Sequence, residues 1–129
     1  MSGKILLDTS IAVAILRGRP TALAATLEVQ SSLLPIVALG ELTYGLRRSG
    51  NRRGDDRKLA ALLDRVDVVP ITLTTCERYA SVRHDLKRQG MPIPENDVWI
   101  AATAIEHDLM LATLDHHFQR VGGLRLCVP

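Results

Sequence analysis

Apolar and polar positions alternate along the chain in blocks, and the blocks predict short buried strands separated by helices. The first apolar run stops abruptly at Asp8, as expected for a buried strand that leads into a helix. Pro35 cannot donate a hydrogen bond to a neighbouring strand, so we expect its strand to lie near a sheet edge or to start late. The apolar runs predict five strands, at residues 4–7, 33–37, 66–70, 109–112 and 124–128.

Between these runs, apolar residues recur at the spacing of amphipathic helices. Thr9 or Ser10 is expected to cap the first helix, and Gly18 to end it. The last helix is apolar nearly all round, which is typical of a buried central helix, and residues 49–54 form a polar, flexible-looking loop. The predicted helices cover residues 11–16, 21–30, 38–48, 55 or 56 to 65, 74 or 75 to 89, and 96 or 97 to 106. This alternation predicts a three-layer α/β/α fold with a mainly parallel, roughly five-stranded sheet.

Composition narrows the class of protein. A length of 129 residues fits one domain spanning residues 1–129, and 47% hydrophobic residues suffice for a core. Because aromatics make up only 3%, that core must be aliphatic. Cys76 and Cys127 lie far apart, in no metal-ligand spacing, and are expected to be reduced and buried. The N-terminal apolar run is too short for a signal peptide, and no run approaches the ~20 residues of a membrane span. We therefore expect a cytoplasmic protein.

Four acidic residues occupy corresponding places in this predicted fold. Asp8 ends the first strand, Glu41 lies near the start of the helix after the second, Asp97 opens the buried helix, and Asp115 follows the fourth strand. Carboxyl ends of parallel strands and the helix N-termini after them share one edge of the sheet, where ligands bind. The topology therefore predicts that the four acids converge.

Four ionised carboxylates cannot crowd together without compensation, because like charges raise pKa values and favour protonation. A divalent cation removes the conflict, and Mg²⁺ or Mn²⁺ prefers oxygen ligands. Such a site can activate a water and stabilise charge on a phosphate, with one ion or two. Taken singly, each acid also fits a plain structural role: a helix cap, a residue favoured by the helix dipole, or a turn former. The joint placement favours the metal site.

Other positions allow two readings. The net charge of +2 is weak evidence for nucleic-acid binding, and the basic stretch from Arg47 to Arg53 fits either contact with RNA phosphates or a solvated loop. Gly45 inside a helix indicates close packing of another backbone, within the chain or across a dimer. The hydroxyl of Tyr44 either borders the site or packs half-buried, and Trp99 is expected in the core.

Four segments, in this order and spanning nearly the whole chain, resemble PIN-domain ribonucleases, most closely the VapC-type toxins of toxin–antitoxin pairs. They are LLDTS at residues 6–10, GELTYG at 40–45, IPENDVWIAATA at 93–104 and LATLDHHF at 111–118. Each motif is short, and together they are specific. The family often has Ser or Thr capping the second-segment helix, where this chain has residues 38–40 as Ala-Leu-Gly.

The resemblance implies an endoribonuclease that uses Mg²⁺ or Mn²⁺ and a metal-activated water, commonly as a homodimer. Its metal site matches Asp8, Glu41, Asp97 and Asp115. Thr113 matches a supporting hydroxyl residue that orients a ligand or the water, and Ser10 is a weaker candidate for a similar role. A small VapB-type antitoxin, usually also a DNA-binding repressor, is the implied partner. The adjacent histidines, 116 and 117, are expected on a solvated turn outside the site.

Two other functions fit the same fold. One is a housekeeping PIN nuclease in RNA processing, and the other is a module that holds RNA or a protein without cutting. The presence of all four acids argues against the second. The sequence does not identify the RNA that is cut or its cleavage site, the number of metal ions, the dimer geometry or the antitoxin.

Overall fold

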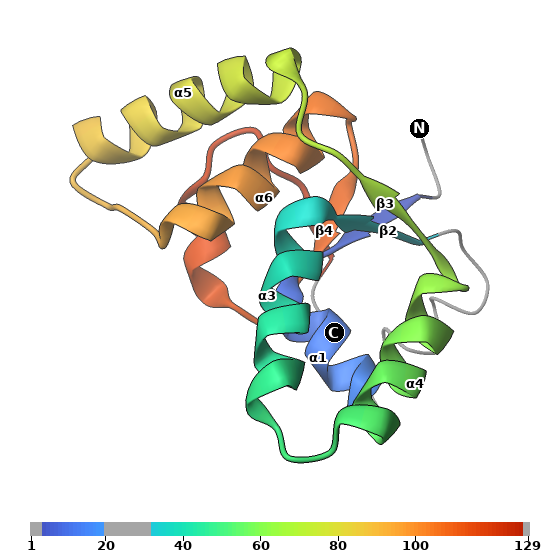
Figure 1. The fold of residues 1–129 in the computed structure, drawn as a ribbon. Helices are drawn as coiled ribbons and strands as arrows, with labels where there is room; N and C mark the ends of the chain where they lie inside the picture. Colours follow the sequence, from blue (N-terminus) through green and yellow to red (C-terminus); the bar gives the residue numbers. More distant parts are fainter. Residues whose placement is uncertain (1–3, 20–31, 128–129) are drawn as a thin grey trace.

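A computed structural model describes residues 4–19 and 32–127 of the chain (Figure 1). Strands and helices alternate in the order that the hydrophobic pattern predicts. They are β1 (Ile5–Leu7), α1 (Thr9–Leu16), β2 (Ser32–Pro35), α3 (Ile36–Arg48), α4 (Arg52–Leu63), β3 (Val66–Val69), α5 (Leu73–Arg88), α6 (Glu95–Glu106), β4 (Met110–Ala112), the 3₁₀ turn η1 (His116–Arg120) and β5 (Leu126–Cys127). The helix predicted at residues 21–30 lies outside the described residues.

The five strands form one parallel sheet in the order β3-β2-β1-β4-β5. β1 is central, with Leu6 paired to Leu33 of β2 on one side and to Leu111 of β4 on the other. The chain reverses its direction of travel across the sheet beside β1, and this reversal is the switch point at which ligands bind in open α/β sheets. The predicted fold class is confirmed.

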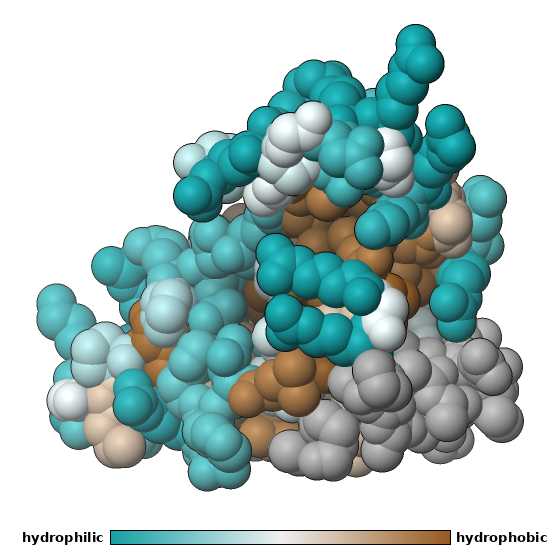
Figure 2. Space-filling model, turned by 90° about the horizontal axis from the view of Figure 1, so that it is seen from below, coloured by the Kyte–Doolittle hydropathy of each residue, from teal (hydrophilic) through white to brown (hydrophobic). Residues whose placement is uncertain are grey.

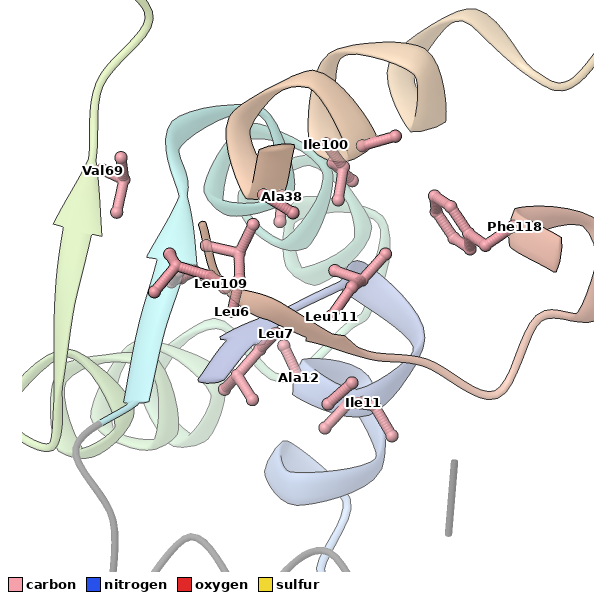
Figure 3. Close-up of a cluster of buried hydrophobic side chains, with 14 of the residues drawn as sticks. Leu6, Leu7, Ile11, Ala12, Ala38, Val69, Ile100, Leu109, Leu111 and Phe118 are labelled. Carbon is pink, nitrogen blue, oxygen red and sulfur yellow. The ribbon is translucent and has the colours of Figure 1, made fainter. Parts of the chain in front are cut away.

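Helices cover both faces of the sheet and leave its carboxyl edge accessible. Successive side chains of a strand point to opposite faces, and β1 shows this clearly (Figure 3): Leu7 lies on the side of Ile11 in α1, and Leu6 on the side of Ala38 in α3 and Ile100 in α6. α5 packs on α6, and α3 contacts both α1 and α6. α3 thus connects the helical layer of α1 with that of α6.

Among the described residues the buried core is aliphatic, as the composition predicts, except for one aromatic side chain. Phe118 in η1 is fully buried and holds the segment after β4 against the core. The apolar helix is α6, which buries most of its length, as predicted. Trp99 is only half-buried, because its ring lies between α6 and α5 and stacks on Tyr79 with 3.9 Å between ring centroids.

Three predicted helix starts are wrong, because a different residue caps each helix. Asp8, not Thr9 or Ser10, accepts the capping hydrogen bond of α1. Asn51 caps α4, so the helix begins within the predicted loop and ends at Leu63 instead of residue 65. Thr72 caps α5 through a reciprocal pair with Thr75. Polar residues cluster at each start, and the pattern does not reveal which one adopts the extended backbone that a cap needs.

The second strand also differs from its prediction. β2 ends at Pro35 and α3 begins at Ile36, two residues earlier than expected. β2 lies between β3 and β1, so it is not an edge strand. Pro35 is tolerated because it is the last strand residue and the N-cap of α3, where a missing N–H costs little. α6 likewise begins earlier than predicted, after Pro94, which places Asp97 within its first turn.

Two further expectations about single residues are corrected. Cys76 is exposed and Cys127 half-buried, so the thiols are not both in the core. Gly45 is exposed, and a Cβ built there meets nothing within 4 Å among the described residues, so close packing inside this part of the chain does not explain it. Within the described ranges, no helix combines the length and the apolar character that a bilayer crossing requires.

Candidate active site

The four predicted acids line one open cleft at the carboxyl edge of the sheet. Asp8 follows β1, Glu41 lies in the second turn of α3, Asp97 in the first turn of α6, and Asp115 between β4 and η1. The cleft has a volume of about 800 Å³. The parallel topology therefore brings together side chains that are up to 107 positions apart in sequence, as the pattern predicted.

Asp8 is the most deeply placed of the four, with 1% of its surface exposed. Its Oδ1 accepts hydrogen bonds from the Ser10 hydroxyl at 2.6 Å and the Ile11 backbone N–H at 3.1 Å. Its Oδ2 accepts one from the buried Thr113 hydroxyl at 2.5 Å. The Thr113 hydroxyl also accepts from the Asp115 backbone N–H at 2.9 Å. Thr113 thus connects the first and last acids of the cluster.

Ser10 makes a second bridge between the same two segments. Its hydroxyl accepts a hydrogen bond from the Leu114 backbone N–H at 3.1 Å while it donates to Asp8. The loop after β4 is therefore fixed to the start of α1 by two hydroxyls, Ser10 and Thr113. Both candidate supporting residues therefore donate a hydrogen bond to Asp8.

Glu41 is positioned by a residue that the sequence pattern did not assign to the site. The Thr9 hydroxyl donates to Glu41 Oε1 at 2.6 Å. Thr9 is the first residue of α1, next to the capping Asp8. The only sequence signal was its place directly after Asp8, where it had been expected to cap the helix.

His117 lies in the cleft, which corrects the expectation that both histidines are on a solvated turn. His117 Nε2 is 2.6 Å from Asp97 Oδ2, and its side chain is 23% exposed, whereas His116 is exposed. The reason is η1: burial of Phe118 fixes this turn and directs the preceding ring toward α6. One ligand atom each from Asp97, Asp115 and His117 lie within 4.8 Å of one another.

The electrostatics of the cleft are unfavourable for ionised carboxylates. Burial raises the pKa of Asp8, against the opposing effect of its hydrogen bonds, and the negative charge of Asp115 raises it further. Burial likewise raises the pKa of Asp97, with added repulsion from Glu41 and Asp8, although His117 opposes this. Within residues 4–19 and 32–127, no lysine or arginine forms an ion pair with any of the four acids. A cation from solution would relieve this repulsion.

The donor set fits a divalent cation with a preference for oxygen. Carboxylate oxygens from four different elements face one cleft, and hydrogen bonds hold the side chains of Asp8 and Glu41 in place. Mg²⁺ and Mn²⁺ are the usual occupants of such sites.

Among the described residues, one arginine and no lysine line the cleft. Arg19, just after α1, lines the cleft together with the acids. Arg17, two positions earlier, lines a different groove, between α1, α3 and α4. The exposed arginines between Arg47 and Arg53 are not among the lining residues of the cleft. Tyr44 is 67% exposed and does not line it, so neither reading of that residue holds.

Comparison with known proteins agrees with the architecture. A family model described as PIN domain matches residues 5–124. Ribonuclease VapC1 of Haemophilus influenzae (strain R2866) is 33% identical over 128 residues, 93% of each chain, and the tRNA(fMet)-specific endonuclease VapC of Shigella flexneri is 29% identical over 95% of each. Among solved structures, VapBC2 from Rickettsia felis, bound to a DNA fragment from their promoter, matches with a TM-score of 0.91 and 26% identity, over 97% of this chain and 98% of that one.

Proposed function

Because the chain belongs to the PIN-domain family, among its VapC-type ribonucleases, we propose that it is a divalent-metal-dependent endoribonuclease and the toxin of a toxin–antitoxin pair. One observation carries the metal dependence: four acids line one cleft, with no ion pair to lysine or arginine in the described parts of the chain. The ribonuclease names of the relatives support RNA as the substrate. The proposal concerns a single PIN domain acting in the cytoplasm.

Each acid has a part in the proposed site. Asp8, Glu41, Asp97 and Asp115 would hold Mg²⁺ or Mn²⁺. When bound, the ion would make a water more acidic and offset negative charge on the phosphodiester. Thr113 donates to Asp8 and accepts from the backbone N–H of Asp115, so it would hold the two acidic residues in fixed positions relative to each other.

The buried position of Asp8 gives it the largest expected part in catalysis. We expect Asp8→Asn to abolish RNA cleavage and to leave the fold intact, because the amide keeps the shape of the side chain and one acceptor for the N–H of Ile11. The experiment maps RNA 5′ ends in cells after brief induction of either protein. New ends that appear with the wild type and not with the variant support the proposal. Cleavage by the variant at the wild-type rate would contradict the role of Asp8.

The toxin role needs a separate test, since a housekeeping PIN nuclease would have the same site. We expect growth arrest when the protein is expressed alone, and relief when the small protein encoded next to it is co-expressed. Failure to arrest growth, with RNA cleavage intact, would favour the housekeeping alternative. No cleavage of any cellular RNA with Mn²⁺ or Mg²⁺ present would favour a module that only binds.

A groove between α1, α3 and α4 is the surface that we propose for a VapB-type antitoxin, the partner suggested by VapBC complexes among the structural neighbours. Hydrophobic surface is visible between hydrophilic side chains on the face seen from below (Figure 2). The groove shares Val13 and Glu41 with the cleft, so a bound segment would reach the acids. Its other apolar lining comes from Leu16, Leu42 and Leu46. We also propose that the protein forms a homodimer, which sedimentation of the purified protein would test.

A further inference from the structure

We propose that His117 supplies a nitrogen ligand to the cation held by Asp97 and Asp115, and that this imidazole gives the site a preference for Mn²⁺ over Mg²⁺. The inference rests on the proposed function, because it concerns the same cation. It adds a residue outside the four acids and a chemical basis for the choice of ion.

The positions of the three side chains suit a shared ion. His117 Nε2 is 2.6 Å from Asp97 Oδ2, and the ligand atoms of Asp97, Asp115 and His117 all lie within 4.8 Å of one another. With bonds of about 2.1 Å, ligands at right angles on one ion are about 3 Å apart and opposite ligands about 4.2 Å apart. The three groups therefore need only small side-chain rotations to surround an ion.

The fold holds the imidazole toward the acids. His117 lies in η1 next to Phe118, whose ring is fully buried and packs at 4.8 Å, centroid to centroid, against the imidazole. Only 23% of the His117 side chain is exposed, and its Nε2 points to a carboxylate. A histidine directed into a group of acids, rather than to solvent, has the placement of a ligand.

Ligand chemistry then determines which ion the site prefers. Mg²⁺ takes oxygen ligands and loses water reluctantly, whereas Mn²⁺, which also prefers oxygen, is a first-row transition ion and accepts an imidazole nitrogen more readily than Mg²⁺ does. A site with oxygens and one nitrogen should therefore bind Mn²⁺ more tightly than Mg²⁺, and removal of the nitrogen should reduce that difference. The competing role is a hydrogen bond alone: His117 donates to Asp97 and never contacts the ion. His117→Gln separates the two roles, because its amide N–H can still donate to Asp97.

Pulsed electron paramagnetic resonance of the Mn²⁺-loaded protein measures this contact directly. We expect the wild type to show nuclear modulation from one ¹⁴N nucleus of a coordinated imidazole, and ¹⁵N-labelled histidine to change it. His117→Gln should remove the signal. His116→Gln is the matched control, since His116 is the exposed neighbour, and it should keep the signal.

Binding titrations with Mn²⁺ and with Mg²⁺ give a second readout. We expect His117→Gln to weaken Mn²⁺ binding by at least about tenfold, the lower end of what loss of a supporting residue costs at metal sites, and to change Mg²⁺ binding much less. Mn²⁺ bound to the wild type without nitrogen modulation would overturn this inference and leave the proposed metal site standing. Absence of any Mn²⁺ binding would overturn both.

Discussion

Helix α6 carries three acidic residues whose partners differ. Glu95 and Glu106 bond to residues of α5, whereas Asp97 lines the cleft beside the other acids. Toward α5, the Glu95 carboxylate pairs with Arg83 at 2.7 Å and accepts a hydrogen bond from Tyr79, although Glu95 also borders the cleft. At the other end, Glu106 accepts hydrogen bonds from two threonines of the α5 N-terminus. Asp97, in the first turn, has His117 as its partner, and its pKa is raised mainly by burial and further by the negative charges of Glu41 and Asp8.

The comparison shows which acids have hydrogen-bond donors or cationic partners within the fold. Those that join α6 to α5 have donors within the chain, so they stabilise packing. The four acids of the candidate site repel one another, and within the described residues none of them forms an ion pair with lysine or arginine. A protein retains such a cluster at a cost in stability, and pKa values perturbed in this way are typical of functional sites. A change from carboxylate to amide should therefore lower activity on the cleft side of α6 and lower stability on the side that faces α5.

The largest expected effect comes from changing carboxylate to amide at each place on α6. Asp97→Asn should lower RNA cleavage by more than about a hundredfold, because loss of a ligand should exceed the ~10–100-fold loss that a supporting residue causes. Glu106→Gln should leave cleavage unchanged and lower the free energy of unfolding by about 1 kcal/mol, the usual contribution of one hydrogen bond. Cleavage rates with Mn²⁺ and urea denaturation measure the two effects.

Glu106→Gln is the matched control, since it changes the same group on the same helix. Equal losses of activity in both variants would mean that the contrast between the two sides is wrong. Unfolding of Asp97→Asn would also contradict the contrast, because the loss of cleavage would then result from lost stability and not from a lost metal ligand.

The parts of this site that sequence could predict are those that depend on topology. Asp8 directly follows β1, and Asp115 lies three residues after the end of β4, so parallel order alone places them at one edge. His117 was missed because its direction depends on a 3₁₀ turn fixed by Phe118, and the helical and strand periodicities do not encode such a turn. The contact of Thr9 with Glu41 is not predictable from the pattern, because backbone angles decide which of Asp8, Thr9 and Ser10 caps α1. Helix starts were wrong for the same reason.

A smaller effect should appear in the pH dependence of stability of the metal-free protein. The pKa of Asp8 in the folded state lies above its ordinary value of 3.8, mainly through burial. As pH rises from 3.8 through the folded pKa, the unfolded chain loses this proton before the folded chain does, so the folded state loses stability. Asp8→Asn does not titrate. The stability of the variant relative to the wild type should therefore rise across this interval and then level off.

Urea denaturation with a chelator present, at a series of pH values, measures that difference. Any constant cost from the changed hydrogen bond to Thr113 shifts the whole curve and leaves its slope unaffected. A flat or falling difference would show that Asp8 is not destabilised by burial in the cleft. Addition of Mn²⁺ should restore stability to the wild type at neutral pH and much less to the variant.

The smallest expected effect concerns Arg19, the basic residue that lines the cleft, and compares it with Arg17. In an Asp97→Asn background that does not cut, Arg19→Ala should weaken RNA binding by up to about fivefold, the equivalent of ~1 kcal/mol for an exposed ion pair. It should also reduce the slope of log affinity against log salt by about 0.7, as expected for one lost phosphate contact on a single strand.

Fluorescence anisotropy with a labelled RNA at several salt concentrations measures both values. Arg17→Ala is the control, because Arg17 is also exposed but lines the groove between α1, α3 and α4. Equal effects from the two arginines would mean that general positive charge, not position at the cleft, attracts the RNA. A larger effect from Arg17 would place the RNA in the groove assigned to the antitoxin, and the two molecules would then compete for one surface. A loss of RNA affinity confined to Arg19→Ala would mean that the RNA binds at the cleft and that the groove stays available for the antitoxin.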